Sequence, residues 1–151
     1  MGGLSDHAQG GLLTERNVAL MREAYDRIGS GGAWGENVAW ELIADDVIVR
    51  DRPEIPDPQV YRGREGLIKA VSSSDESFDE FGMDPTDIIG VGDSYVVIVL
   101  RMWGRGRGSG VHVEETIAHQ WRVRDGKAAE LQVYSDPDDA LRDARVAEGI
   151  A

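Results

Sequence analysis

The chain contains no cysteine and few basic residues. Without a thiol among its 151 residues, disulfide bonds, thiolate nucleophiles and cysteine-based metal sites are excluded. The 16 Lys and Arg residues are outnumbered by 28 Asp and Glu residues, which gives a formal charge of −12. Because so acidic a surface repels phosphate backbones and anionic lipids, we expect neither nucleic acid nor a membrane as a partner.

Long apolar runs and metal-ligand clusters are missing as well. No stretch approaches the length of a membrane-spanning helix, and no apolar segment follows a basic start as in a secretion signal. The three histidines, at positions 7, 112 and 119, are scattered along the chain, and no phosphate-binding or dinucleotide motif is present. We therefore expect no metal and no cofactor, and a cytoplasmic location.

The first third of the chain shows helical periodicity after a glycine-rich start. Residues 1–13 are expected to form a flexible tail, and residues 14–147 a single domain. Thr14 can cap a helix that runs to about Gly29. Apolar residues recur along this helix at the spacing of one face, and they are Val18, Met21, Tyr25 and Ile28.

Between the first helix and residue 80 the sequence gives weaker signals of secondary structure. A short second helix is expected to end near Trp40 and Ile43, followed by a strand over residues 47–49. A third helix is expected over roughly residues 64–71. The polar, acidic segment 72–80 is expected to be a solvated loop.

The second half of the chain has the pattern of a four-stranded meander. Asp125-Gly126 is a strong signal for a two-residue hairpin between strands. Asp136-Pro137 is typical of a helix start, with Asp as the cap and Pro in the first turn. The expected strands are Thr86–Val91, Tyr95–Trp103, Val111–Arg124 and Ala128–Tyr134.

This order predicts an α+β domain. Its core would be a curved antiparallel sheet, a cone-like half barrel, with three N-terminal helices over the concave face. Because a strongly twisted sheet curls, helices across its hollow side leave room for a small molecule.

Alternation along the strands assigns side chains to faces. One strand would point inward with Val111, Val113, Ile117, His119, Trp121 and Val123. The preceding strand would carry an apolar row on the face that the helices leave bare, formed by Val96, Ile98, Leu100 and Met102. So large an exposed apolar row favours burial between two copies, and we expect a homodimer.

Several strings in this order resemble the nuclear transport factor 2-like superfamily, in particular its SnoaL-like and ketosteroid-isomerase-like branch. The resemblance spans about residues 14–145. The strings are Leu42-Ile43-Ala44-Asp45-Asp46-Val47 with Asp51 further on, Tyr61-Arg62-Gly63-Arg64-Glu65-Gly66, Trp121-Arg122-Val123-Arg124-Asp125-Gly126-Lys127, and Tyr134-Ser135-Asp136.

The resemblance implies site residues one position at a time. Asp51 stands where ketosteroid isomerases carry the general base, and Tyr25 where they carry an oxyanion-stabilising Tyr. Their second acid is replaced here by His119 or, without a one-residue gap, by Ala118. The gap keeps the apolar residues in phase, which favours His119. We also expect aromatic residues around the ligand, namely Trp121, Trp103, Tyr61 and Trp40.

Two functions compete at this point. The first is cofactor-independent acid–base catalysis, an isomerase or cyclase acting on a small apolar carbonyl compound, with Asp51 as base and Tyr25 and His119 as donors to the oxyanion. The second is a non-catalytic ligand-binding or dimeric scaffold protein of the same fold. Under that reading Tyr25 and His119 are core residues, and Asp51 caps a loop.

Overall fold

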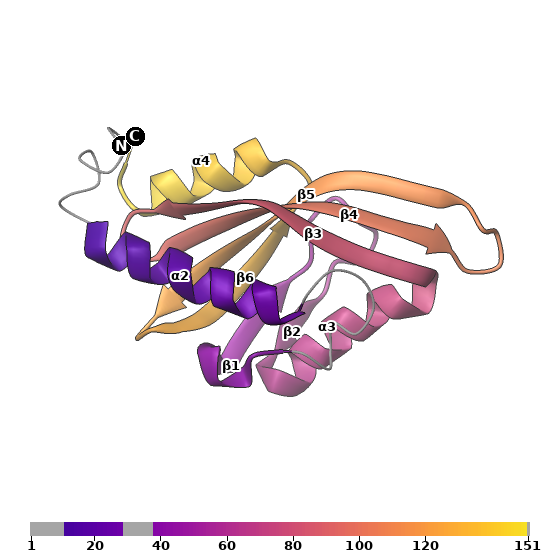
Figure 1. Ribbon diagram of the computed structural model, residues 1–151, viewed down its shortest axis with the longest axis horizontal. Helices are drawn as coiled ribbons and strands as arrows, with labels where there is room; N and C mark the ends of the chain where they lie inside the picture. Colours follow the sequence, from indigo (N-terminus) through magenta and orange to yellow (C-terminus); the bar gives the residue numbers. More distant parts are fainter. Residues whose placement is uncertain (1–10, 29–37, 151) are drawn as a thin grey trace.

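The computed structural model describes residues 11–28 and 38–150, in which helices lie on both sides of a six-stranded sheet (Figure 1). The elements are α2 (Gly11–Ile28), the 3₁₀ turn η2 (Trp40–Leu42), β1 (Ile43–Arg50), β2 (Val60–Arg62), α3 (Gly63–Ser77), β3 (Phe78–Val91), β4 (Tyr95–Gly106), β5 (His112–Arg124), β6 (Lys127–Tyr134) and α4 (Pro137–Ala147). Most of the expected tail and of the expected second helix lies outside the described residues. None of the described helices is long and apolar enough to cross a membrane.

The sheet confirms the expected α+β class and meander. Its strand order is β2-β1-β6-β5-β4-β3, and β3 to β6 pair antiparallel in sequence. The expectation of a purely antiparallel sheet needs one correction, because β1 joins β6 in parallel. The long connection through α3 and the meander allows this pairing, which brings the end of β1 beside the end of β6.

Two local signals are confirmed in detail. Asp125 and Gly126 both have positive φ angles, 53° and 73°, as a tight hairpin between β5 and β6 requires. Asp136 caps α4 by accepting a hydrogen bond of 2.9 Å from the backbone N–H of Asp138, and Pro137 occupies the first turn.

Several boundaries differ from the sequence prediction. Helix α2 already begins at Gly11, and the Thr14 hydroxyl, expected as its cap, donates to the carbonyl of Gly92 instead. Ile43 opens β1 rather than ending a helix.

The prediction of a loop over residues 72–80 is wrong. Helix α3 continues to Ser77, and β3 starts directly at Phe78. The long ladder with β4 extends this strand, and Phe78 stacks on Phe81 with ring centroids 5.6 Å apart. A half-exposed strand rich in acidic residues has the composition of a loop, which explains the error.

The apolar row on β4 faces inward, which corrects the premise of the dimer prediction. Val96, Ile98 and Leu100 are fully buried in the main core beneath the helices. Their partners across the β4–β5 ladder are Trp121, His119 and Ile117, so both rows share the concave face. Without an exposed row, the homodimer stays a prediction that lacks this argument.

The opposite face of the sheet is covered in part by α4 (Figure 1). Ala140 and Ala144 of this helix pack against Val97 and Ala118 in a second, smaller core. The β4–β5 hairpin projects beyond the helices at the far end of the sheet. Val111 and Val113, expected to point into the core, are therefore exposed.

Helix α2 lies so close to β3 that it leaves no room for a side chain at Gly90. A Cβ there would lie 2.4 Å from a methyl carbon of Thr14 and 2.9 Å from one of Val18. We expect Gly90→Ala to lower the free energy of unfolding by about 1–3 kcal/mol, measured by urea denaturation. The control is Gly11→Ala, because none of the described residues comes within 4 Å of a Cβ at that position. Equal stabilities of the two variants would contradict the close packing.

Candidate active site

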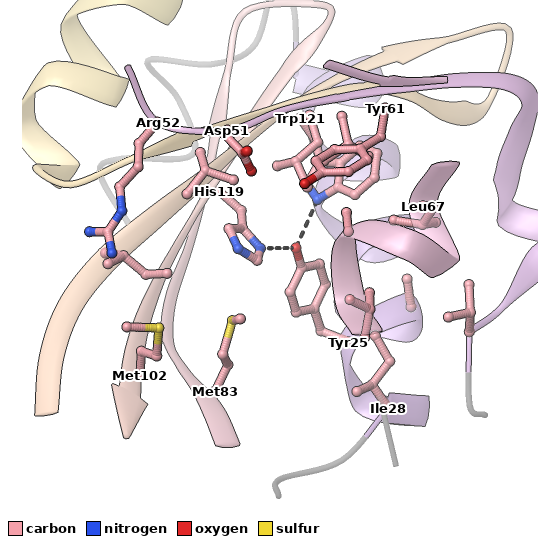
Figure 2. A pocket seen from close by; sticks show the side chains of 18 of the residues that line it. Tyr25, Ile28, Asp51, Arg52, Tyr61, Leu67, Met83, Met102, His119 and Trp121 are labelled. Carbon is pink, nitrogen blue, oxygen red and sulfur yellow. Dashed lines mark hydrogen bonds between the residues drawn. The ribbon is translucent and has the colours of Figure 1, made fainter. Parts of the chain in front are cut away.

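A cavity of about 440 Å³ opens between the concave face of the sheet and helices α2 and α3 (Figure 2). This volume lies within the range of small-molecule sites. The walls are mainly apolar and include Met21, Ala24, Ile28, Ile43, Val49, Leu67, Phe81, Met83, Met102, Ile117, Leu131 and Val133. The few polar side chains therefore decide how a ligand is oriented.

Five of the seven site residues expected from the sequence line this cavity. They are Tyr25, Asp51, Tyr61, His119 and Trp121. They come from α2, from β2 and β5, and from the segment directly after β1.

The other two expected site residues, Trp103 and Trp40, do not line the cavity. The Trp103 indole lies on the outer face of the sheet, over Gly82, and its N–H donates to Asp84 at 3.2 Å. The Trp40 ring packs beside the main core, with the Arg64 guanidinium carbon 5.4 Å from its centroid. Both corrections have one cause: aromatic character indicates burial, but not on which side of a sheet or helix a ring lies.

Three buried side chains form a hydrogen-bonded chain at the cavity wall. The indole N–H of Trp121 donates to the hydroxyl oxygen of Tyr25 at 2.8 Å. The same hydroxyl lies 2.6 Å from Nδ1 of His119. His119 and Trp121 are two residues apart on β5 and so share its concave face, whereas Ala118 points to α4 on the other side. Of the two positions left open for the second acid, the structure therefore brings His119 to the cavity.

Burial keeps the two titratable side chains of this hydrogen-bonded group, His119 and Tyr25, neutral. Loss of hydration lowers the pKa of His119 to about 3. It also raises the pKa of Tyr25 far above its usual value, and the hydrogen bond from Trp121 opposes this only in part. At neutral pH the pair therefore combines an imidazole and a phenol that can polarise a bound carbonyl without carrying a charge.

Asp51 stands in the same row of the sheet as His119. The β1–β6 register pairs Arg50 with Gln132, so that Asp51 follows beside Val133, and Val133 is paired with His119. Two strand spacings separate the backbones by about 10 Å. The curvature of the sheet turns the side chains toward each other, and Figure 2 shows the carboxylate and the imidazole facing one cavity.

The Asp51 carboxylate is held on one side only. Its Oδ2 accepts a hydrogen bond of 3.0 Å from the backbone N–H of Gln59. The backbone N–H of Asp51 in turn donates to the Gln59 carbonyl at 3.1 Å. Within residues 11–28 and 38–150 the second oxygen, Oδ1, takes part in no hydrogen bond. A half-buried carboxylate with one anchored and one open oxygen is placed to accept a proton.

Arg52 is a cavity residue that the sequence analysis missed. Its guanidinium makes a two-pronged contact with the Glu115 carboxylate, at 3.0 and 3.1 Å, and reaches Ser135 at 3.3 Å. These bonds tie the segment after β1 to β5 and to the residue that follows β6, and the Glu115 carboxylate balances the charge of the arginine. No sequence signal links Arg52 to a residue 63 positions away.

Within the ranges that the structure describes, no three His, Asp or Glu side chains are grouped so that they could hold a metal ion.

The buried histidine should make the folded chain less stable in mild acid. Its pKa is about 3 when folded, against 6.5 for a solvated histidine. Between these values the unfolded chain binds the extra proton, so the free energy of unfolding falls as the pH drops below about 6.5. The loss due to His119 is about 2 kcal/mol at pH 5, and it can be measured by urea denaturation at pH 7.5 and pH 5.

Two variants separate the contribution of His119 to this loss of unfolding free energy from the contributions of the acidic side chains. His119→Gln removes the titrating group and should show a smaller loss between the two pH values. His112→Gln, at an exposed histidine, should keep nearly the full loss. Identical pH dependence in the parent chain and His119→Gln would argue against a buried neutral imidazole.

Known proteins share this arrangement of elements. The chain is similar in structure to a nuclear transport factor 2-like protein of unknown function from Burkholderia pseudomallei, at 18% identity and a TM-score of 0.65, over 84% of this chain and 95% of that one. It also resembles a candidate SnoaL-like polyketide cyclase from Jannaschia sp. CCS1, at 19% identity and a TM-score of 0.64, over 84% and 90%.

A third similar structure, from Catenulispora acidiphila, has a ketosteroid-isomerase-like fold and was solved in complex with trimethylamine. It is 19% identical, with a TM-score of 0.56 over 78% of this chain and 81% of that one. No curated protein matches the chain. The model of the SnoaL-like domain family matches residues 21–131. The chain therefore belongs to the SnoaL-like domain family, and it shares the fold of nuclear transport factor 2-like proteins.

Proposed function

We propose that the protein catalyses cofactor-free proton transfer next to the carbonyl group of a small, largely apolar ketone. Asp51 removes a proton from the carbon beside the carbonyl, and the buried pair of His119 and Tyr25 stabilises the enolate oxygen. The observation that carries this proposal is the placement of the carboxylate and the pair on one apolar cavity.

The chemistry balances without a cofactor. The C–H bond breaks, its electron pair becomes the enolate, and the proton moves to the open oxygen of Asp51. Return of the proton to a different carbon isomerises the substrate. Attack of the enolate carbon on a second carbonyl of the same molecule forms a carbon–carbon bond and breaks the π bond of that carbonyl. The resulting alkoxide takes back the proton from Asp51, which completes an aldol ring closure. Neither route needs an oxidant or a reductant.

The neighbouring structures support this class of reaction by fold alone. One is described as a candidate polyketide cyclase and another as ketosteroid-isomerase-like. Both descriptions fit reactions that begin by forming an enolate. The apolar walls and the neutralised Arg52 favour an uncharged substrate over a carboxylate.

A second function, ligand binding without turnover, is favoured by the deep burial of His119, which is only 5% exposed. In that case the hydrogen-bonded chain orients a ligand and stabilises the core. A homodimer and a cytoplasmic location are compatible with either function and stay predictions.

The two functions are separated by exchange of carbon-bound protons in heavy water. A panel of small cyclic ketones and β,γ-unsaturated ketones is incubated with the protein, and deuterium next to the carbonyl is followed by NMR. The proposal expects exchange above the buffer rate for at least one ketone class. A binder would instead change the tryptophan fluorescence of the protein in a saturable way, through Trp121 in the cavity wall, with exchange at the buffer rate, and that result would overturn the catalytic proposal.

A further inference from the structure

The chain of hydrogen bonds from Trp121 to His119 has a direction. An indole N–H can only donate, so the Tyr25 oxygen is the acceptor of the 2.8 Å bond. A neutral imidazole has one nitrogen that donates and one that accepts. The direction of the second bond, between Tyr25 and Nδ1 of His119, therefore determines which imidazole nitrogen carries the hydrogen.

The geometry and chemistry of this second bond favour the phenol as donor. Its length of 2.6 Å lies in the range of O–H donors and below that of N–H donors. An imidazole nitrogen is a far stronger base than a phenol oxygen, and a phenol is the more acidic donor. The Tyr25 oxygen also already accepts from Trp121, which strengthens its O–H as a donor.

We infer that Trp121, acting through Tyr25, holds His119 in the neutral tautomer with its hydrogen on Nε2, and so makes the imidazole the hydrogen-bond donor of the site. The role of this donor in catalysis rests on the proposed function, whereas the tautomer itself does not. Trp121 and Tyr25 are then positioning residues. This differs from the expectation that Tyr25 and His119 each donate directly to the oxyanion.

The burial of the three side chains supports the same assignment. Tyr25, His119 and Trp121 are all at most 5% exposed, so water competes little for these bonds. Burial also lowers the pKa of the imidazole to about 3, so the imidazole stays neutral in mild acid. With the hydrogen on Nε2, His119 cannot act as a second base at that nitrogen, which leaves proton abstraction to Asp51.

The tautomer is measurable without any substrate. The protein is labelled with ¹⁵N histidine, and the two ring nitrogens of His119 are identified by NMR, since the nitrogen without hydrogen resonates far downfield. We expect the hydrogen on Nε2 from neutral pH to about pH 5. A hydrogen on Nδ1, or a doubly protonated ring at neutral pH, would overturn the inference.

Two variants and one control test the role of Trp121. Trp121→Phe keeps an aromatic ring but removes the N–H, and Tyr25→Phe removes the hydroxyl. Each should populate the second tautomer, visible as averaging or doubling of the His119 signals, more strongly for Tyr25→Phe. Trp103→Phe is the matched control, because that indole donates to Asp84 on the outer face. His119 signals in Trp121→Phe that match those of Trp103→Phe would rule out positioning by Trp121.

Further readouts keep this test independent. If Trp121→Phe fails to fold, the His119 signals of Tyr25→Phe show whether the tautomer depends on the hydrogen bonds that run from Trp121 through Tyr25. In the exchange assay Trp121→Phe should lower kcat more than it changes KM, because the variant keeps the aromatic wall of the cavity and loses only the N–H that acts on His119 through Tyr25. A parent protein with the Nε2 tautomer but no ketone exchange would overturn the proposed function and leave the tautomer inference intact.

Discussion

Asp51→Asn is expected to reduce ketone proton exchange by about two to four powers of ten, the usual contribution of a general base. The amide has nearly the same shape, and its oxygen can still accept the hydrogen bond from the Gln59 backbone. Ligand affinity and stability should therefore change little. Exchange rates are compared by NMR, affinity by ligand-induced change in tryptophan fluorescence, and stability by urea denaturation.

Asp57→Asn is the matched control for this substitution. Asp57 also lines the cavity, but it is exposed and sits in the turn after the site, at a φ angle of 54° that asparagine tolerates well. Asp57→Asn removes one negative charge, as Asp51→Asn does, but it leaves the proposed base in place. If both variants slow exchange by the same factor, the effect is general electrostatics, and Asp51 is not the base.

His119→Ala is expected to act on both rate and stability. Loss of one oxyanion donor lowers the exchange rate by about two to three powers of ten or less. The substitution also leaves the buried Tyr25 hydroxyl without its acceptor, which should cost about 1–3 kcal/mol of unfolding free energy. Exchange is measured well below the unfolding temperature of the variant, so that the two effects separate.

The ranking of these variants distinguishes catalysis from binding. For an enzyme, Asp51→Asn has the larger effect on rate and His119→Ala the larger effect on stability. For a binder, His119→Ala destabilises the fold while Asp51→Asn is nearly silent in every assay. Exposed His112→Ala serves as the control for loss of an imidazole. A His119→Ala variant as stable as this control would contradict the buried hydrogen-bonded chain.

Local patterns in the sequence were enough for the class of fold, and the family resemblance was enough for much of the site. Asp125-Gly126 and Asp136-Pro137 act through the backbone angles and caps of a few adjacent residues, so their outcome hardly depends on the rest of the chain. The positions of Asp51, Tyr25 and His119 followed from family resemblance, and the structure brings all three to one cavity.

Only the tertiary structure decided which face of each strand is covered. Alternation along β4 separates Ile98 from Val97, but it does not say which side the helices occupy, and both sides proved to be buried. In the same way, nothing local distinguishes Trp121 in the cavity from Trp103 on the outer face.

Long-range pairing was equally beyond reach of the sequence. The bond between Tyr25 and His119 joins residues 94 positions apart, and it exists because α2 crosses the concave face where β5 presents its imidazole. The pairing of Arg52 with Glu115 likewise depends on the parallel register of β1 and β6. The sequence by itself thus determined most of the elements, and through the family resemblance it indicated the candidate chemistry. Packing and register decided which groups meet, because contacts between distant residues are set by the whole fold and not by local conformational preference.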